Sequence, residues 1–294
     1  MELGFAVDWI RATTKHHSIK QMIDRFSYGF EFEDWMSFKP KEGYDCGLQN
    51  PYGHQVMWCT YRDDMGVNVQ FPGRSCHELH DAGIDVLGIV TELSEDAFKF
   101  TRLDLAIDLK GVYIDIPALL DCEHTGSANN DPELYVKGRK ARGGATLYIG
   151  SRQSDKYVRI YDKAKERKLN DVLWVRLEIE LKKATATKIA KMLVGKTELE
   201  AGIMAQQMIK GVYNPDHAAL QEALRVEPMR VGSTKNEEHN TYDWIMGSVS
   251  KTLARLIIEL PHRDVEETFM KEVRKHIREL AAKGLNKPDD SEMV

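Results

Sequence analysis

The stretch YVRIYDKAKERKLNDVLWVRLEIEL, residues 157–181, contains two segments in which polar and apolar side chains alternate with a period of two. Side chains at odd positions from 157 to 163 are polar or aromatic, while those at positions 175, 177, 179 and 181 are all apolar. Successive side chains of a strand point to opposite sides, so the spacing predicts two strands, each with one apolar face and one charged face.

A third segment, TRLDLAIDL at 101–109, has the same alternation, with Arg102, Asp104 and Asp108 on one side and leucine and isoleucine on the other. If the three strands are neighbours, their charged groups converge on one surface. The carboxylates that would meet there are Asp104, Asp108, Glu178 and Glu180.

Carboxylates held this closely repel one another and raise one another's pKa. A divalent cation relieves the repulsion, and oxygen ligands suit Mg²⁺ or Mn²⁺. With the Tyr161 hydroxyl and the flanking Arg159 and Lys163, these groups are the parts needed for phosphodiester transesterification on DNA. The competing interpretation has equal weight: an amphipathic sheet whose carboxylates form ion pairs with Arg102, Arg159 or Arg176.

The composition bounds the class of protein without deciding its function. A chain of 294 residues suggests one large domain or two. The formal net charge of -5 does not exclude DNA binding, which needs only a local basic surface. No apolar run reaches membrane-spanning length, and no basic-then-apolar leader is recognisable, so the expected location is the cytoplasm. Four well-separated cysteines are typical of reduced thiols rather than of a disulfide framework.

The order of predicted elements indicates an α+β fold with a central, mainly antiparallel sheet of a nicking-enzyme type and a helical C-terminal part. Strand, helix, hairpin and helix are expected within residues 1–95, the last helix at 76–93, and strands follow at 98–109, 145–163 and 174–183. The order strand, helix, strand, strand occurs twice, which allows a duplicated half. The predicted domains are a catalytic domain at 1–184, a helical portion at 185–284 and a flexible tail at 285–294.

Five motifs resemble the replication initiation factor family of rolling-circle plasmids and phages: VDWI (7–10), MGVNVQFPGRSC (65–76), TRLDLAIDL (101–109), LYIGSRQSDKYVRIYDK (147–163) and WVRLEIELKK (174–183). The resemblance covers roughly residues 3–185. Relaxases of some conjugative transposons are similar in the same segments. Other rolling-circle nickases use a His-apolar-His pair for the metal, and this chain has no such pair.

The resemblance implies a metal-dependent, site-specific single-strand nick at a hairpin origin. The family's nucleophile is the tyrosine of the RxYxK segment, here Tyr161, which would form a 5′-phosphotyrosine and leave a free 3′-hydroxyl. The metal ligands implied are Asp104, Asp108, Glu178 and, as a further candidate, Glu180. A host helicase and a homodimer are the implied partners, in addition to origin DNA that is single-stranded at the nick.

Geometry limits some of these assignments. Asp104 and Asp108 share a strand face but lie about 13 Å apart at strand rise, so one metal cannot take both directly unless the strand bends. Glu178 and Glu180 are about 7 Å apart and could reach one ion. A free tyrosine has a pKa of about 10, and Arg159 or Lys163 is expected to lower it. Tyr157 is the main rival nucleophile, followed by Tyr148.

Further basic residues are candidates for DNA contact. Arg159 and Arg176 could clamp a phosphate bidentately, or could simply balance charge within the site. The Gly-rich segment KGRKARGG and the following hairpin provide the candidate DNA-binding residues Lys137, Arg139, Lys140, Arg142 and Arg152. Three functions remain open: a nicking-joining enzyme in replication or conjugative transfer, a catalytically silent origin-binding regulator, and a small-molecule-binding protein.

Overall fold

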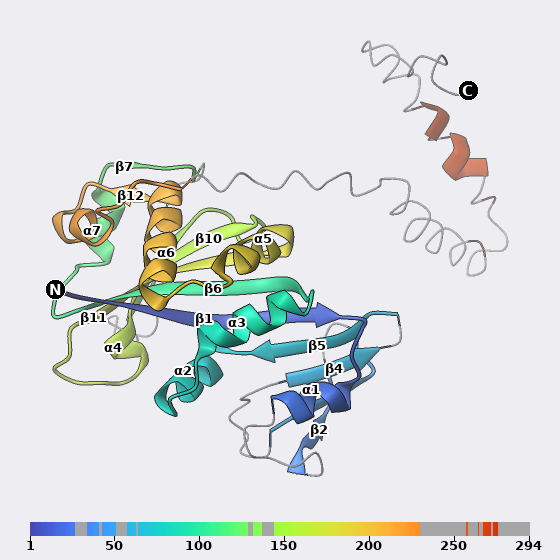
Figure 1. The fold of residues 1–294 in the computed structure, drawn as a ribbon. Coiled ribbons are helices and arrows are strands. Elements are labelled where there is room, and N and C mark those ends of the chain that lie inside the picture. The colour runs from blue at the N-terminus through green and yellow to red at the C-terminus, as the bar shows by residue number, and fades with distance from the viewer. Residues whose placement is uncertain are drawn as a thin grey trace. The chain divides into compact units, whose positions relative to one another are not determined.

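The computed structural model describes residues 1–26, 34–40, 43–50, 58–62, 64–128, 132–136 and 144–229, and short pieces at 257, 264, 267–271 and 273–275. The chain divides into two compact units, Met1–Thr234 and Lys235–Val294. The labelled helices and strands of Figure 1 lie in the first unit.

A ten-stranded sheet in the order β2-β3-β4-β5-β1-β6-β11-β10-β9-β8 forms the centre of the first unit. Its described pairings are all antiparallel, which confirms the predicted α+β class. The strands are β1 (Glu2–Thr14), β2 (Met36–Phe38), β3 (Cys46–Gln49), β4 (Trp58–Arg62), β5 (Gly66–Phe71), β6 (Lys99–Lys110), β8 (Glu133–Val136), β9 (Ala145–Ile149), β10 (Lys156–Asp162) and β11 (Trp174–Lys182). A separate two-stranded sheet pairs β12 (Asn214–Pro215) with β7 (His124–Thr125).

The strand order of the large sheet repeats about its two long central strands. Strand β1 is followed by β2 to β5, and β5 returns to pair with β1. Strand β6 is followed by β8 to β11, and β11 returns to pair with β6. The two halves meet where β1 pairs with β6. This topology is that of the duplicated half that the sequence allowed.

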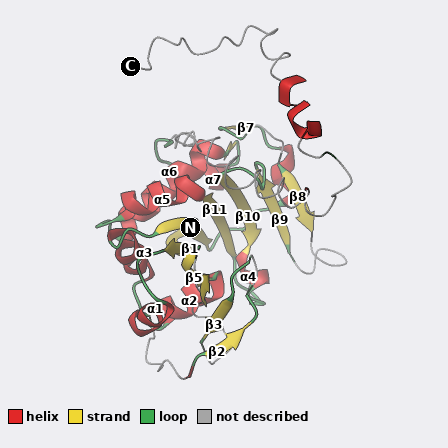
Figure 2. Ribbon diagram, turned by 90° about the vertical axis from the view of Figure 1, so that its right-hand side faces the viewer, coloured by secondary structure: helices red, strands yellow, loops and turns green. Residues whose placement is uncertain are grey.

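Helices cover the apolar face of the sheet. The apolar side chains of β6 that the alternation predicted, Leu103, Leu105, Ile107 and Leu109, are at most 2% exposed. Figure 2 shows α3, α5 and α6 together on one side of the sheet. The helices are α1 (Ile19–Arg25), α2 (Gly73–Asp81), α3 (Val86–Glu95), α4 (Lys163–Glu166), α5 (Lys183–Leu193), α6 (Glu198–Val212) and α7 (Ala218–Ala223), with a 3-10 turn at Pro117–Asp121.

Helices α5 and α6 belong to the same compact unit as the sheet, beyond the domain boundary that was predicted at 184. Both contact β6 and β11, and their buried residues, such as Ile189 and Met208, join the core of the sheet. The physical reason is the apolar stripe of each helix, which needs a partner that the sheet's apolar face supplies. The helices predicted from 242 to 283 lie largely outside the described residues, and the tail at 285–294 lies entirely outside them.

The single helix predicted at 76–93 is wrong, because the chain forms two helices there. Gly83 adopts φ +79°, a left-handed conformation that ends α2 and that glycine takes without steric cost. Asp85 then accepts a hydrogen bond from the backbone N–H of Gly88 at 2.8 Å and begins α3. Within the described residues, no helix is both long enough and apolar enough to cross a membrane.

Candidate active site

The polar face of the sheet carries rows of side chains that run across several strands. In one row, Tyr135 of β8 pairs with Thr146 of β9, and Thr146 pairs with Tyr161 of β10. Tyr161 pairs with Arg176 of β11, which pairs with Asp108 of β6. Paired residues of neighbouring strands lie about 5 Å apart with their side chains on the same face. The condition set by the sequence analysis is therefore met, because the three strands β10, β11 and β6 are neighbours.

Two further rows on this face carry the other candidate residues. The second contains Tyr148, Arg159 and Glu178, and ends on the small side chain of Ala106. A third row contains Tyr157, Glu180, Asp104 and Trp9. The register thus brings together all four predicted carboxylates and Tyr161, as the alternation required.

The Tyr161 hydroxyl lies between an acid and a base. It donates a hydrogen bond to Oε2 of Glu178 at 3.1 Å, and the ammonium of Lys163 lies 3.4 Å from it. Burial and the carboxylates of Glu178 and Asp8 raise the pKa of Tyr161 well above its ordinary value. The expectation of a lowered pKa is therefore wrong, because burial and the two carboxylates outweigh the attraction of nearby cations such as Arg176. Arg159 and Lys163 are also paired with carboxylates, the latter with Glu166 at 2.6 Å.

Arg159 links two of the carboxylates that were predicted to hold a metal. Its guanidinium donates to Asp104 at 3.0 Å and to Oε1 of Glu178. Burial raises the pKa of Glu178 to about 7, with Asp104 adding to the shift and Arg159 opposing it. Burial likewise raises the pKa of Asp104, against the attraction of Arg102 and Arg159. Asp104 and Glu178 therefore share the Arg159 guanidinium in a buried environment that disfavours their ionised forms.

Glu180 lies at the rim of the same cluster. Arg102 contacts it at 3.0 Å and also binds Asp104, while Lys182 lies 2.8 Å from the other Glu180 oxygen. Burial opposes ionisation of Glu180, but Lys182 and Arg102 outweigh it and hold the pKa of Glu180 below its ordinary value. Glu180 is thus a charged ion-pair partner.

Arg176 is held between two carboxylates beneath the site. It donates to both oxygens of Asp108, at 2.7 and 2.6 Å, and to Oδ1 of Asp8. The residue is 3% exposed. These contacts use all three of its nitrogens, so Arg176 balances charge here and does not present a free fork to a phosphate.

Asp8 belongs to the site, although the sequence analysis included it only as part of the VDWI motif and not as a candidate site residue. The register between β1 and β6 shifts between Val7 and Trp9, which leaves Asp8 in a β-bulge. Bulges re-aim a side chain and are enriched beside active sites. Burial and the nearby Glu178 carboxylate raise the pKa of Asp8 to about 6. An acidic residue that interrupts the alternation in VDWI was the available signal.

Gly73, the first residue of α2, fits tightly against Asp8. A Cβ on Gly73 would lie 2.9 Å from the Asp8 carbonyl oxygen and 3.0 Å from its Oδ2. Such distances do not occur between real atoms without movement, so the start of α2 and the bulge of β1 depend on the absence of a side chain at this position.

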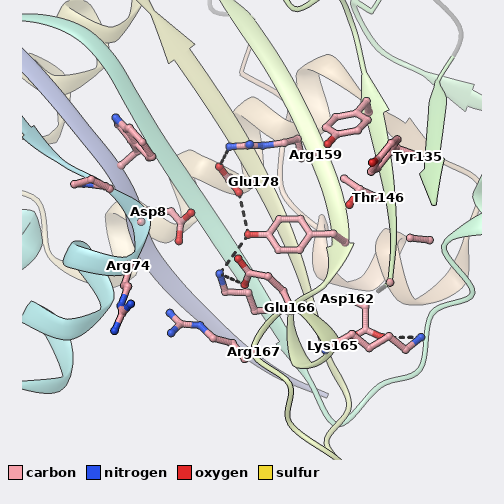
Figure 3. Close-up of a pocket in the computed structure, with 18 of the residues that line it drawn as sticks. Asp8, Arg74, Tyr135, Thr146, Arg159, Asp162, Lys165, Glu166, Arg167 and Glu178 are labelled. Atoms are coloured by element: carbon pink, nitrogen blue, oxygen red, sulfur yellow. Dashed lines mark hydrogen bonds and ion pairs between the residues drawn. The ribbon is translucent and has the colours of Figure 1, made fainter. Parts of the chain in front are cut away.

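A pocket of about 960 Å³ opens over the Tyr161 hydroxyl. Tyr161, Asp8 and Glu178 all line it, and Figure 3 shows the two carboxylates. Its rim carries basic side chains from α2 and from the segment after β10, namely Arg74, Lys165, Arg167 and Lys168. The sequence analysis did not select these residues. The basic run KAKERK directly after Tyr161 was the signal that could have found them.

The other candidate residues lie around this pocket or outside the described chain. Tyr157, the rival nucleophile, is 4% exposed and stacks on Tyr148 with 5.7 Å between ring centroids. Burial raises the pKa of Tyr157. Tyr148 lines the pocket, and Arg152 lies over its ring at 5.1 Å. The predicted DNA-binding residues Lys137, Arg139, Lys140 and Arg142 lie outside the described residues.

For the metal, the described part of the chain contains no group of three or more His, Cys, Asp or Glu side chains that could hold an ion. Asp104, Asp108 and Glu180 are paired with arginine or lysine, as the competing interpretation expected. Four carboxylate residues line the pocket, namely Asp8, Asp162, Glu166 and Glu178. Among them, Asp8 and Glu178 belong to the central strands β1 and β11 and are paired with Arg176 and Arg159, respectively. Mg²⁺ is commonly bound by one or two carboxylates together with substrate phosphates and water, so this pair fits such an ion.

Comparisons with known proteins point to one family. The model of the family described as replication initiation factor matches residues 98–273, more than half of the chain. A protein of Bacillus subtilis (strain 168) that carries the name DNA relaxase NicK is 27% identical over 227 residues, which are 69% of this chain and 62% of that protein. A replication initiation protein of Staphylococcus aureus is 36% identical over 102 residues, 32% of this chain and 29% of its own length.

The chain therefore spans less than two thirds of the length of either relative. Among solved structures, a rolling circle replication initiator protein from Geobacillus stearothermophilus has the same fold, with a TM-score of 0.64 and 21% sequence identity. That match covers 78% of this chain and 99% of the other.

Proposed function

Because the chain belongs to the replication initiation factor family, we propose that it is a DNA nicking-joining enzyme with Tyr161 as its nucleophile. The observation that carries the proposal is the position of the Tyr161 hydroxyl. It lies at a pocket with a basic rim, it donates to Glu178 at 3.1 Å, and the Lys163 ammonium lies 3.4 Å away. A nucleophile, a proton acceptor and a cation for the developing charge are thus adjacent.

In the proposed reaction, Oη of Tyr161 attacks the scissile phosphorus, and the phosphorus–O3′ bond breaks. The phenolic proton passes to Oε2 of Glu178, and the departing 3′ oxygen takes a proton from solvent. The product is a 5′-phosphotyrosine and a free 3′-hydroxyl. Reversal of the same steps rejoins the strand, because the phosphotyrosine retains the energy of the phosphodiester.

The raised pKa of Tyr161 decides how it attacks. A free phenolate is disfavoured beside Glu178 and Asp8, so the proton must leave while the new bond to phosphorus forms. Glu178, whose pKa is about 7, is half ionised near neutral pH and is matched to that transfer. Lys163 stabilises the negative charge that develops on the phosphoryl oxygens.

We propose that Mg²⁺ or Mn²⁺ assists this site, held by Asp8 and Glu178 and by the phosphate of the DNA. Both carboxylates line the pocket and have raised pKa values, which a bound cation would lower. When bound, the ion supplies charge neutralisation at the scissile phosphate. Asp104, Asp108 and Glu180 then hold the arginines that shape the site, and their role as direct ligands stays a prediction.

The proposed substrate is origin DNA that is single-stranded at the nick. A host helicase and a homodimer remain predictions from the family. The similarity to a protein named as a relaxase and to one named as a replication initiation protein leaves two uses for the nick: the start of rolling-circle replication and the start of strand transfer. The sequence of the DNA that is nicked distinguishes them.

Covalent trapping tests the proposal. The protein is incubated with labelled single-stranded or supercoiled origin DNA and Mg²⁺ or Mn²⁺, then denatured and separated by electrophoresis. A labelled adduct in wild type that is absent in Tyr161→Phe and present in Tyr157→Phe supports it. An adduct that persists in Tyr161→Phe would move the nucleophile, and specific binding without any adduct would identify a silent origin-binding regulator.

A further inference from the structure

Tyr135 is an exposed aromatic residue in an unusual position. It lies on β8, the last strand at one edge of the sheet, and is 56% exposed. Exposed tyrosines are ordinary on a protein surface, and Tyr113 is 70% exposed. Tyr135 differs because it lines the pocket that contains Tyr161, whereas Tyr113 does not line that pocket.

The register places Tyr135 in the same row as Tyr161, with Thr146 between them. Figure 3 shows the side chains of Tyr135 and Thr146 at the pocket. Two strand spacings, about 9.5 Å, therefore separate the two tyrosines along the sheet. A base stacked between two aromatic rings needs roughly 9 to 14 Å between the centroids of those two rings. The short side chain of Thr146 forms the floor between the rings, so the row has the dimensions of a slot for one flat ring.

The charges around the slot fit a nucleic acid strand. Lys165, Arg167 and Lys168 line the pocket that contains Tyr161, and so does Arg74 of α2. Arg74 is paired with Glu78 at 2.7 Å but remains largely exposed. Basic groups along one side and aromatic rings along the other are the arrangement by which proteins hold a single strand, with phosphates on the cations and bases on the rings.

We propose that Tyr135 is a DNA-positioning residue that stacks on the base next to the scissile phosphate, over Thr146 and beside the ring of Tyr161. This inference rests on the proposed function, because it places a nucleotide of the nicked strand. It also implies that the pocket binds unpaired DNA, because a base within a duplex cannot present both of its faces to flanking aromatic rings.

Binding measurements test the slot separately from the chemistry. All variants carry Tyr161→Phe, which removes the hydroxyl and keeps the ring. The probe is a short oligothymidylate with one 2-aminopurine, followed by anisotropy for affinity and by 2-aminopurine quenching for stacking. Tyr135→Ala is expected to weaken binding roughly 5- to 150-fold and to abolish the quenching. Tyr135→Phe keeps both, and Tyr113→Ala is the matched exposed control that changes neither.

The floor of the slot offers a second test. Thr146→Val keeps the volume of the side chain and is expected to bind like the parent, whereas Thr146→Phe fills the slot and loses the quenching. Thermal unfolding verifies that each variant is folded. If Thr146→Phe is not folded, the exposed Tyr135 variants still decide the question.

Three results would overturn the inference: parent-like binding and quenching in Tyr135→Ala, tighter binding of duplex than of single-stranded probe, or no binding by the parent. These outcomes are distinguishable from failure of the proposed function. A protein that forms no adduct but loses single-strand binding in Tyr135→Ala has the slot without the chemistry. A protein that forms the Tyr161 adduct but is indifferent to Tyr135→Ala has the chemistry without the slot.

Discussion

The Tyr161 hydroxyl donates its hydrogen bond to Glu178 at 3.1 Å, although the residue opposite Tyr161 in the sheet is Arg176. Glu178 is a diagonal neighbour on β11, opposite Arg159. The Arg176 side chain is directed instead to Asp8 and Asp108. Because Asp8 and Asp108 bind the Arg176 guanidinium, the Tyr161 hydroxyl forms its hydrogen bond with Glu178 and not with the arginine opposite it.

Glu178→Gln is expected to slow adduct formation by roughly 10²- to 10⁴-fold, since an amide cannot take the phenolic proton. Because Glu178 must be ionised to accept it, wild-type activity should rise with pH through the pKa of Glu178, which is about 7 without metal and lower when the proposed cation is bound. The variant should lose that rise. The measurement is the pH profile of kcat/KM for nicking, and an unchanged rising limb in the variant would assign the titration to another group.

Stability should fall as pH rises from about 4 to about 7. The pKa of Asp8 is raised to about 6 and that of Glu178 to about 7, so the folded state binds more protons than the unfolded state in this range. Each carboxyl group therefore adds about 3 kcal/mol to the free energy of unfolding at a pH below its unfolded pKa. This contribution is lost as the pH rises through the pKa of the group in the folded state. Urea unfolding across this range should show a shallower decline in the double variant Asp8→Asn, Glu178→Gln. An equal decline in both proteins would contradict this assignment.

Arg176→Met should lower the free energy of unfolding by about 3 to 5 kcal/mol, because it leaves Asp8 and Asp108 buried without their cation. Arg152→Met is the control, since Arg152 is exposed and its removal should cost less than about 1 kcal/mol. Urea denaturation of both variants provides the comparison. Similar stabilities would mean that the buried ion pairs contribute little.

Gly73→Ala should reduce adduct formation while leaving the protein folded. The new Cβ would lie 2.9 Å from the Asp8 carbonyl oxygen, so either the bulge of β1 or the start of α2 must move. Gly4→Ala is the matched control, because its Cβ would meet Asp108 at an ordinary 3.6 Å. Nicking rates and thermal unfolding are measured for both. Full activity in Gly73→Ala would show that the position of Asp8 is not critical.

Metal removal should abolish adduct formation if the proposed ion assists the site. After treatment with a chelator, activity is titrated back with Mg²⁺. Asp8→Asn should raise the Mg²⁺ concentration for half-maximal activity by at least about tenfold, through loss of one proposed ligand. Glu180→Gln should leave it near the wild-type value, because Glu180 is paired with Lys182 and Arg102. The opposite ranking would make Glu180 the ligand.

The alternation in residues 101–109 and 157–181 determined which side chains share a face, because strand geometry leaves only two sides. It thereby predicted that Tyr161 shares one face of the sheet with Asp104, Asp108, Glu178 and Glu180, and the strand register agrees. Spacing alone could not predict which partner each carboxylate takes, since several arginines compete for them on one face. It also could not predict the helix break at Gly83, where apolar spacing continues across a turn.

By itself, the sequence determined the antiparallel strands, their apolar and charged faces and the candidate nucleophile, because these follow from local periodicity and from motifs. Only the tertiary structure decided that Asp8 joins the site, from a bulge 153 residues away from Tyr161 in the chain. It also decided that two carboxylates hold Arg176 and that Tyr135 shares a row with Tyr161. Such relationships depend on register and side-chain direction across strands, which the linear order of residues does not encode locally.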